Sequence, residues 1–223
     1  MSRPTRDALI KDLVADAAKP VRNGAQTHLE SALWVVLAAV WVVALTHLPG
    51  ELRPGVMDQL ASSPRLWTEL ALGFGTTVAF AHLAFRSALP GSPSLLLSAL
   101  PALTLLILWV GLHLYGFVDP TFAPSMHGKR EHCEWQVLTF GIPVLACGAL
   151  VLRRWWPRGA FSGAALGLAA GALPAMLMQI ACMHEPWHIL THHLLPGLAL
   201  GPIGAVVGFL VLRPPRGQSV PRP

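Results

Sequence analysis

The sequence predicts an all-α integral membrane protein, a bundle of six transmembrane helices preceded by a short cytoplasmic amphipathic helix. Hydrophobic residues make up 53% of the 223 residues and charged residues only 12%, about half the charged share that is usual in soluble domains. A soluble chain of this length cannot bury so much apolar surface, because small proteins have a high ratio of surface to volume. Much of the apolar surface is therefore expected to face a lipid bilayer.

Six segments are long and apolar enough to cross a bilayer, for which about 20 residues are needed. These segments are 31–48, 66–85, 95–117, 135–152, 160–181 and 190–212. Several contain glycine or proline, which membrane helices tolerate, and small residues allow neighbouring helices to approach closely. The chain therefore divides into a cytoplasmic segment 1–30, a six-helix transmembrane domain 31–212 and a cytoplasmic Pro/Arg-rich tail 213–223.

The distribution of Lys and Arg predicts the orientation of these spans. With the N-terminus in the cytoplasm, twelve of the sixteen basic residues fall on the cytoplasmic side and four on the outer side. Cytoplasmic loops carry this excess in membrane proteins, so both termini are expected to be cytoplasmic. The N-terminal segment lacks the apolar stretch of a signal peptide. Direct nucleic-acid binding is not expected, because no basic cluster with interleaved aromatic residues occurs.

In this orientation most of the reactive side chains share the outer face. Cys133 and Cys182 lie there, in the loops before the fourth span and after the fifth. Eight of the ten histidines lie there too, namely His47, His113, His127, His132, His184, His188, His192 and His193. Cys147 lies inside the fourth span, where buried packing is its expected role. The bias indicates a functional site on the outer face.

Two chemical interpretations of this cluster remain open. The first is a redox switch, since disulfides persist in a periplasm. The second is metal binding, because thiolate with imidazole suits zinc, copper(I) or cadmium. His184, His188 and His192 are spaced four residues apart and would share one helix face, although Pro186 is expected to interrupt that helix. His132 lies next to Cys133 and is a further candidate ligand.

Other interpretations find less support in the residues. The stretch "HILTHH" fits one histidine box of membrane di-iron enzymes, but the further boxes are missing, no G-x-S-x-G occurs and no intramembrane carboxylate stands out. An enzyme is therefore not expected. A small metal-binding membrane protein or transporter remains the alternative, although its path would need polar residues and the spans offer little beyond His82, His113 and Gln179. Any single histidine could simply cap a helix or meet lipid headgroups.

The N-terminal segment predicts a binding element on the cytoplasmic side. Apolar residues recur there at helical spacing, namely Leu9, Ile10, Leu13, Val14 and Ala17. The polar face carries three aspartates, whereas helices that lie on anionic membranes are rich in Lys and Arg. The pattern favours a helix that orders on binding a partner. A lead-in helix packed on the bundle is the alternative.

Three stretches resemble the bacterial NrsF-type anti-sigma factors, which are six-span inner-membrane proteins that restrain an ECF sigma factor related to SigF. These stretches are "LIKDLVADAAKPVRN" at the N-terminus, "REHCEWQ" before the fourth span and "MLMQIACMHEPWHIL" at the end of the fifth. The resemblance implies that Leu9, Ile10, Leu13 and Val14 contact the sigma factor. It also implies that Cys133 and Cys182 sense oxidants or heavy metals.

The resemblance thus implies an anti-sigma factor that holds its ECF sigma factor at the bacterial inner membrane. Release is expected when Cys133 and Cys182 are oxidised, or when they bind a thiophilic ion such as zinc or cadmium together with His184 or His188. No cofactor is required by this mechanism, and the metal ion enters only as a signal. How the last three spans would act on a segment attached to the first is not evident from the residues.

Overall fold

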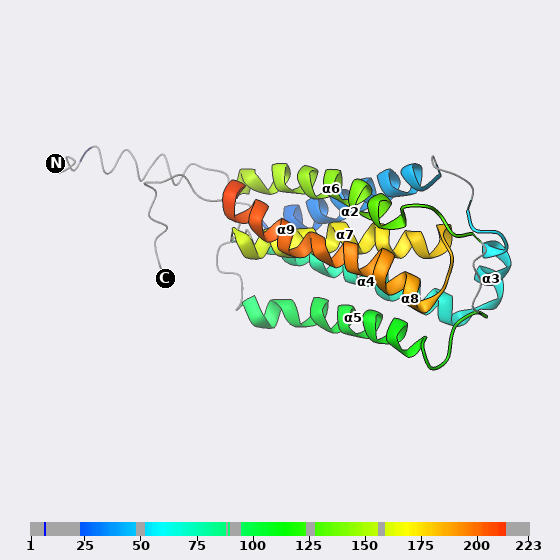
Figure 1. The fold of residues 1–223 in the computed structure, drawn as a ribbon. Helices are drawn as coiled ribbons and strands as arrows, with labels where there is room; N and C mark the ends of the chain where they lie inside the picture. Colours follow the sequence, from blue (N-terminus) through cyan, green and yellow to red (C-terminus); the bar gives the residue numbers. More distant parts are fainter. Residues whose placement is uncertain are drawn as a thin grey trace.

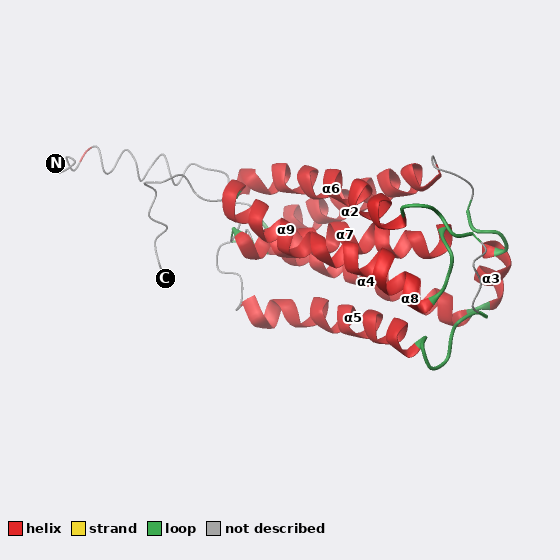
Figure 2. Ribbon diagram, viewed as in Figure 1, coloured by secondary structure: helices red, strands yellow, loops and turns green. Residues whose placement is uncertain are grey.

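The computed structural model describes residues 7, 23–47, 52–87, 89, 95–123, 128–155 and 159–212. This part consists of helices and loops and contains no strand (Figures 1 and 2). Six helical segments are long and apolar enough to span a membrane, which confirms the predicted all-α six-span bundle. They are α2 (Gly24–His47), α4 (Pro64–Arg86), α5 (Leu95–Tyr115), α6 (Cys133–Leu152), α7 (Ala160–Ala181) and the composite span Pro186–Val211.

The composite span has three parts in direct succession. They are α8 (Pro186–His188), a π-helical turn η2 (Ile189–Leu194) and α9 (Leu195–Val211). The short helix α3 (Val56–Ser62) lies between α2 and α4, and a 3-10 turn η1 (Arg153–Trp155) follows α6. The predicted N-terminal helix with Leu9, Ile10, Leu13 and Val14 lies outside the described residues, and so does the tail 213–223.

The first span begins seven residues earlier than its apolar run predicts, at Gly24 instead of residue 31. Asn23 and Gln26 form a reciprocal cap: the Gln26 backbone N–H donates to Asn23 Oδ1 at 2.8 Å, and the Asn23 N–H donates to Gln26 Oε1 at 3.3 Å. Such a capping box satisfies backbone donors that a helix start leaves unpaired. The cap therefore extends the helix beyond its apolar part.

The last span also begins earlier, at Pro186 instead of residue 190. Glu185 caps it by accepting hydrogen bonds from the N–H groups of Trp187 and His188 at 3.0 and 2.6 Å. Proline suits the first position of a helix, where its missing N–H costs nothing. The interruption expected at Pro186 thus falls before His188, and His184 lies outside the helix that carries His188 and His192.

The two ends of the bundle differ in what they carry. The start of α2 and the end of α9 lie at one end, and α3 lies at the other (Figure 1). We call the second end the cysteine end, because α6 starts there with Cys133 and α7 stops there before Cys182. At the opposite end the rings of His28 and His82 stack with centroids 4.6 Å apart, joining α2 to α4.

Helix α7 is the central helix of the bundle. It packs against α2, α4, α6 and α9, and 78% of its most apolar 18-residue stretch is buried. Helix α5 lies at the edge of the bundle and packs chiefly on α4 (Figure 1). Only 22% of its most apolar 18-residue stretch is buried. The outer helices expose large apolar side chains such as Val40 and Ile107, as expected of helices that face lipid.

The backbones of α7 and α9 touch along a row of glycines. A Cβ atom built on Gly171 would lie 1.9 Å from the carbonyl oxygen of Gly197, and one on Gly163 would lie 2.1 Å from that of Gly204. Only glycine permits this approach, which is the arrangement that small residues create between membrane helices. This contact fixes the register of α7 against α9.

Helix α2 is attached to α6 through Trp34. The indole Nε1 of Trp34 donates a hydrogen bond to the carbonyl oxygen of Val144 at 3.3 Å. The indole lies over Gly148, where a Cβ would approach Nε1 to 2.7 Å. The first span is thus held directly by the helix that carries Cys133.

Cys147 is exposed on the outer surface of α6, so the expectation that it is buried is wrong. The buried stripe of α6 includes Val144, Leu145 and Gly148. Residues that recur at 3.6-residue spacing share one helix face, and Cys147 lies beside that face, toward the surface of the bundle.

The glycine contact yields a stability prediction. Gly171→Ala should lower the free energy of unfolding by about 2–3 kcal/mol, because its methyl group would collide with the Gly197 carbonyl and force α7 and α9 apart. Thermal or denaturant unfolding of the full chain in detergent measures the effect. Gly111→Ala on α5 is the matched control, since no atom lies within 4 Å of its added Cβ. Equal stability of the two variants would contradict the prediction.

Candidate functional site

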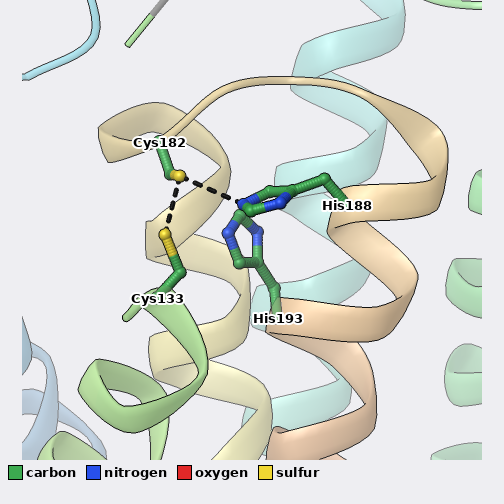
Figure 3. A group of neighbouring side chains, drawn as sticks. All are labelled: Cys133, Cys182, His188 and His193. Carbon is green, nitrogen blue, oxygen red and sulfur yellow. Dashed lines mark hydrogen bonds between the residues drawn. The ribbon is translucent and has the colours of Figure 1, made fainter. Parts of the chain in front are cut away.

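The two cysteines expected on one face meet at the cysteine end of the bundle. Cys133 is the first residue of α6, and Cys182 directly follows α7. Their Sγ atoms lie 2.8 Å apart, and both side chains are buried. A disulfide bond measures about 2.05 Å, so the two thiols are unbonded and in hydrogen-bond contact. Figure 3 shows the two sulfurs directed toward each other, one from the start of α6 and one from the residue that follows α7.

The peptide groups of Arg130 contact both sulfurs. The backbone N–H of Arg130 donates to Cys182 Sγ at 3.4 Å. The single S–H of Cys133 is shared between two acceptors, the carbonyl oxygen of Arg130 at 3.1 Å and Cys182 Sγ at 2.8 Å. The side chain of the same residue reaches α2, where Nη1 donates to the carbonyl oxygen of Thr46 at 2.9 Å. One residue therefore links the cysteine pair to the end of the first span.

Two histidines of the last span complete the group. His188 Nε2 lies 3.3 Å from Cys182 Sγ. His193 is fully buried and its ring interacts with the Cys182 sulfur, although neither ring nitrogen makes a hydrogen bond of ordinary geometry to a described residue. The two imidazole rings meet edge to face, with centroids 5.0 Å apart. One donor atom from each of Cys133, Cys182, His188 and His193 lies within 4.8 Å of the other three (Figure 3).

The π-helical turn explains why His188 and His193 are neighbours. An α-helix advances about 100° per residue, so residues five apart would lie about 140° apart around its axis. The turn Ile189–Leu194 is wider, and the Leu195 N–H donates to the carbonyl oxygen of Leu190, five residues back. This turn brings His193 to the same side as His188. Such turns are frequent at functional sites.

The four-residue spacing used on the sequence did not identify His193. Pro196 follows the turn and has no N–H to donate to the carbonyl of His192. That missing donor was the sequence signal for an irregular helix here. It indicates where the helix departs from regular geometry, but not which side chains become neighbours.

The other predicted ligands lie apart from the cysteines. His184 contacts Glu69, with Nε2 and Oε2 at 2.8 Å. The ring of His192 stacks on His188 with centroids 4.4 Å apart, and its Nδ1 pairs with the Thr191 hydroxyl at 2.7 Å. His132 is exposed and precedes α6 in a left-handed conformation, with φ 59°. Of the four predicted ligands, His188 alone lies in the group around the two sulfurs.

Hydrogen-bond donors surround the sulfur of Cys182. The pKa of this thiol lies below its usual range, because Cys133 and then His188 hydrogen-bond to its sulfur and outweigh the effect of burial. A buried arginine, Arg53, interacts electrostatically with the same sulfur, and burial lowers its own pKa. The contacts of Cys182 with the Arg130 N–H and His188 favour the thiolate, the reactive form of cysteine, at Cys182.

A second polar group lies beside the first, around a buried glutamate on α4. Glu69 is 1% exposed and receives hydrogen bonds from the Thr121 hydroxyl at 2.8 Å and Arg65 Nε at 3.3 Å, besides its contact with His184. The expectation that no carboxylate stands out in the spans is therefore wrong. Arg65, four residues before Glu69, was a sequence signal for such a pair.

Comparison with protein families assigns the chain. The family model described as "NrsF: Negative regulator of sigma F" matches residues 13–213. The match includes both cysteines and begins within the predicted N-terminal helix, after Leu9 and Ile10. No curated protein and no solved structure matches the chain.

The buried glutamate yields a second stability prediction. Glu69→Leu should lower the free energy of unfolding by about 3 kcal/mol, because it leaves the buried His184 without its partner and removes one acceptor each from the partly buried Arg65 and Thr121. Denaturant unfolding in detergent measures the change. Asp58→Asn on α3, an exposed acidic residue, should change stability by less than about 1 kcal/mol. The prediction fails if Glu69→Leu is as stable as Asp58→Asn.

Proposed function

We propose that this chain, which belongs to the NrsF family of negative regulators of sigma F, is a membrane anti-sigma factor controlled by Cys133 and Cys182. It holds an ECF sigma factor related to SigF through Leu9, Ile10, Leu13 and Val14. The family match supports the regulatory role, and the 2.8 Å contact between the two sulfurs is the observation that supports thiol control. The protein acts by binding and release, without catalysis.

The proposed location is the bacterial inner membrane, with both termini in the cytoplasm. The six apolar spans support a multi-pass membrane protein. The orientation is supported by the count along the whole sequence, twelve basic residues in the proposed cytoplasmic segments against four in the outer loops. In the described part, Arg86, Arg153 and Arg154 lie at the end opposite the cysteines, and Arg53, Arg65, Lys129 and Arg130 lie at the cysteine end. The cysteine pair would then face the periplasm, where a disulfide persists.

The proposed signal is oxidation of the pair to a disulfide. Each sulfur gives up one electron, the thiol proton leaves, and a two-electron oxidant such as a peroxide or diamide accepts the electrons. Cys182 is the attacking thiolate, and the sulfurs must close from 2.8 Å to about 2.05 Å. Binding of a thiophilic ion to the same sulfurs is the alternative signal.

Arg130 supplies the proposed route from the cysteines to the first span. Oxidation removes the thiol proton that Cys133 donates to the Arg130 carbonyl. It also pulls Cys182 Sγ, which accepts a hydrogen bond from the Arg130 N–H, toward Cys133. The peptide must therefore move, and with it the guanidinium that holds the Thr46 carbonyl. Since α2 begins at Gly24, its displacement reaches the segment that binds the sigma factor.

The free energy needed to switch the protein sets the required coupling between the thiol pair and the sigma-factor site. Moving a population from 1:99 to 99:1 takes about 5.5 kcal/mol. For a two-electron couple, 30 mV corresponds to about 1.4 kcal/mol. The reduction potential of the thiol pair must therefore differ by about 120 mV between the holding and releasing states. A difference of this size is well within the range of potentials that protein environments impose on dithiols.

Replacement of the cysteines tests this function. In cells that carry a reporter for the sigma factor, the double variant Cys133→Ser and Cys182→Ser should repress normally and lose induction by diamide, because serine cannot form the bond. Cys147→Ser is the matched control and should be induced like the wild type, since that thiol is exposed and lies fourteen residues along α6 from Cys133. A double variant that is still induced would refute thiol control.

The proposed contact of Leu13 with the sigma factor is tested in the same reporter cells. A Leu13→Asp variant should lose repression, and a variant that still represses would refute this contact.

Arg130 makes the coupling route testable by itself. Arg130→Ala keeps both peptide contacts to the sulfurs but removes the hydrogen bond to Thr46. The disulfide should form as in the wild type, measured by thiol labelling, while reporter induction falls at least about tenfold, the loss of about 1.4 kcal/mol of coupling. The neighbouring Lys129→Ala, at an exposed position, should leave induction unchanged. Normal induction in Arg130→Ala would exclude this route.

A further inference from the structure

We infer that Cys133, Cys182, His188 and His193 form a four-ligand site for one tetrahedral thiophilic divalent ion, of which zinc and cadmium are the representatives. This inference deepens the proposed function, on which its regulatory meaning rests, because it names the four residues that coordinate the ion at the same site. It introduces His193 as a ligand and leaves the other outer-face histidines outside the coordination sphere.

The distances fit such an ion. Zinc binds thiolates at about 2.3 Å and imidazole nitrogens at about 2.0–2.1 Å, so ligand atoms around a tetrahedral ion lie about 3.3–3.8 Å apart. The four donor atoms lie within 4.8 Å of one another, and the Cys182 to His188 separation is 3.3 Å. The sulfurs, 2.8 Å apart, need to separate by about 1 Å. Side-chain rotation can supply this movement.

His193 is the observation that points to a ligand. Its side chain is fully buried and directed at the cysteine pair (Figure 3). The ring interacts with the Cys182 sulfur, but neither ring nitrogen makes a hydrogen bond of ordinary geometry to a described residue. A buried polar group without a well-formed hydrogen bond destabilises the fold. A packing role would be filled better by an apolar side chain. Coordination of a metal ion satisfies one of these nitrogens at once.

The ligand set selects the class of ion. Two sulfurs and two imidazole nitrogens in a closed four-ligand group are typical of zinc sites, and cadmium shares the preference for thiolates. Calcium and magnesium require oxygen ligands, which this group does not contain. A divalent ion with two thiolates and two neutral imidazoles has no net charge, which suits a buried site.

The neighbouring histidines are engaged elsewhere, which predicts one ion per chain. His184 pairs with Glu69, and His192 pairs with the Thr191 hydroxyl. Because the ion and the disulfide both need Cys133 and Cys182, each state excludes the other. A metal-loaded chain should therefore resist oxidation by diamide.

Metal titration of the full chain tests the site. The purified, reduced protein in detergent, without added thiols or oxygen, is titrated with Co²⁺ or Cd²⁺ and then loaded with Zn²⁺. We expect one equivalent to bind, a visible Co²⁺ spectrum of tetrahedral type, and X-ray absorption of the zinc form with two sulfur and two nitrogen neighbours. Binding of Zn²⁺ through nitrogen and oxygen alone would overturn the site.

Two variants separate His193 from its neighbour. His193→Ala should weaken Cd²⁺ binding by on the order of 100-fold, since even groups that only orient a ligand change affinity 10–100-fold. His192→Ala should bind like the wild type. Equal affinity in both variants would exclude His193 as a ligand.

A second measurement uses only the wild-type chain and so does not depend on how a variant folds. One equivalent of Zn²⁺ should slow disulfide formation by diamide at least about tenfold, and a chelator should restore it. An unchanged rate would contradict the site. These outcomes are independent of the proposed function, because metal binding is measured without a sigma factor. Loss of induction in the cysteine variants without any metal binding would remove this inference alone.

Discussion

The contact between the backbones of α7 and α9 is the constraint on which the rest of this structure depends. Gly163 and Gly171 bring α7 against Gly197 and Gly204 so closely that any side chain there would collide with a carbonyl group. Cys182 follows the end of α7, and the two histidines of the site precede α9. The glycine row therefore fixes the distance between the sulfur and the imidazole rings, although it lies away from them.

A chemical change at the cysteines has few ways to spread through so closely packed a core, since packed interiors shift between discrete arrangements and do not deform smoothly. Two contacts lead away from the site to the first span. The Arg130 guanidinium holds the end of α2, and α6 holds its middle through Trp34. Both contacts act on α2, which the proposed sigma-binding segment precedes in the chain. They are the proposed route by which the later spans influence the first.

The apolar runs of the sequence were enough to predict six spans, and the positions of Cys133 and Cys182 at span ends were enough to predict that they share a face. Other features required the three-dimensional packing. His193 joins the site only through a π-helical turn, which no 3.6-residue pattern represents. Glu69 gains its importance from His184, 115 positions away. Cys147 is exposed because the packed stripe of α6 passes beside it.

The central claim is that the redox state of two thiols sets the affinity for a sigma factor on the other side of the membrane. The most direct measurement is the dissociation constant of the sigma factor for the full chain in lipid nanodiscs, first reduced, then with the Cys133–Cys182 disulfide verified by mass spectrometry, then reduced again. The account predicts that oxidation weakens binding at least about 100-fold, or 2.7 kcal/mol, and that reduction restores it. An unchanged affinity with the disulfide fully formed would contradict the account.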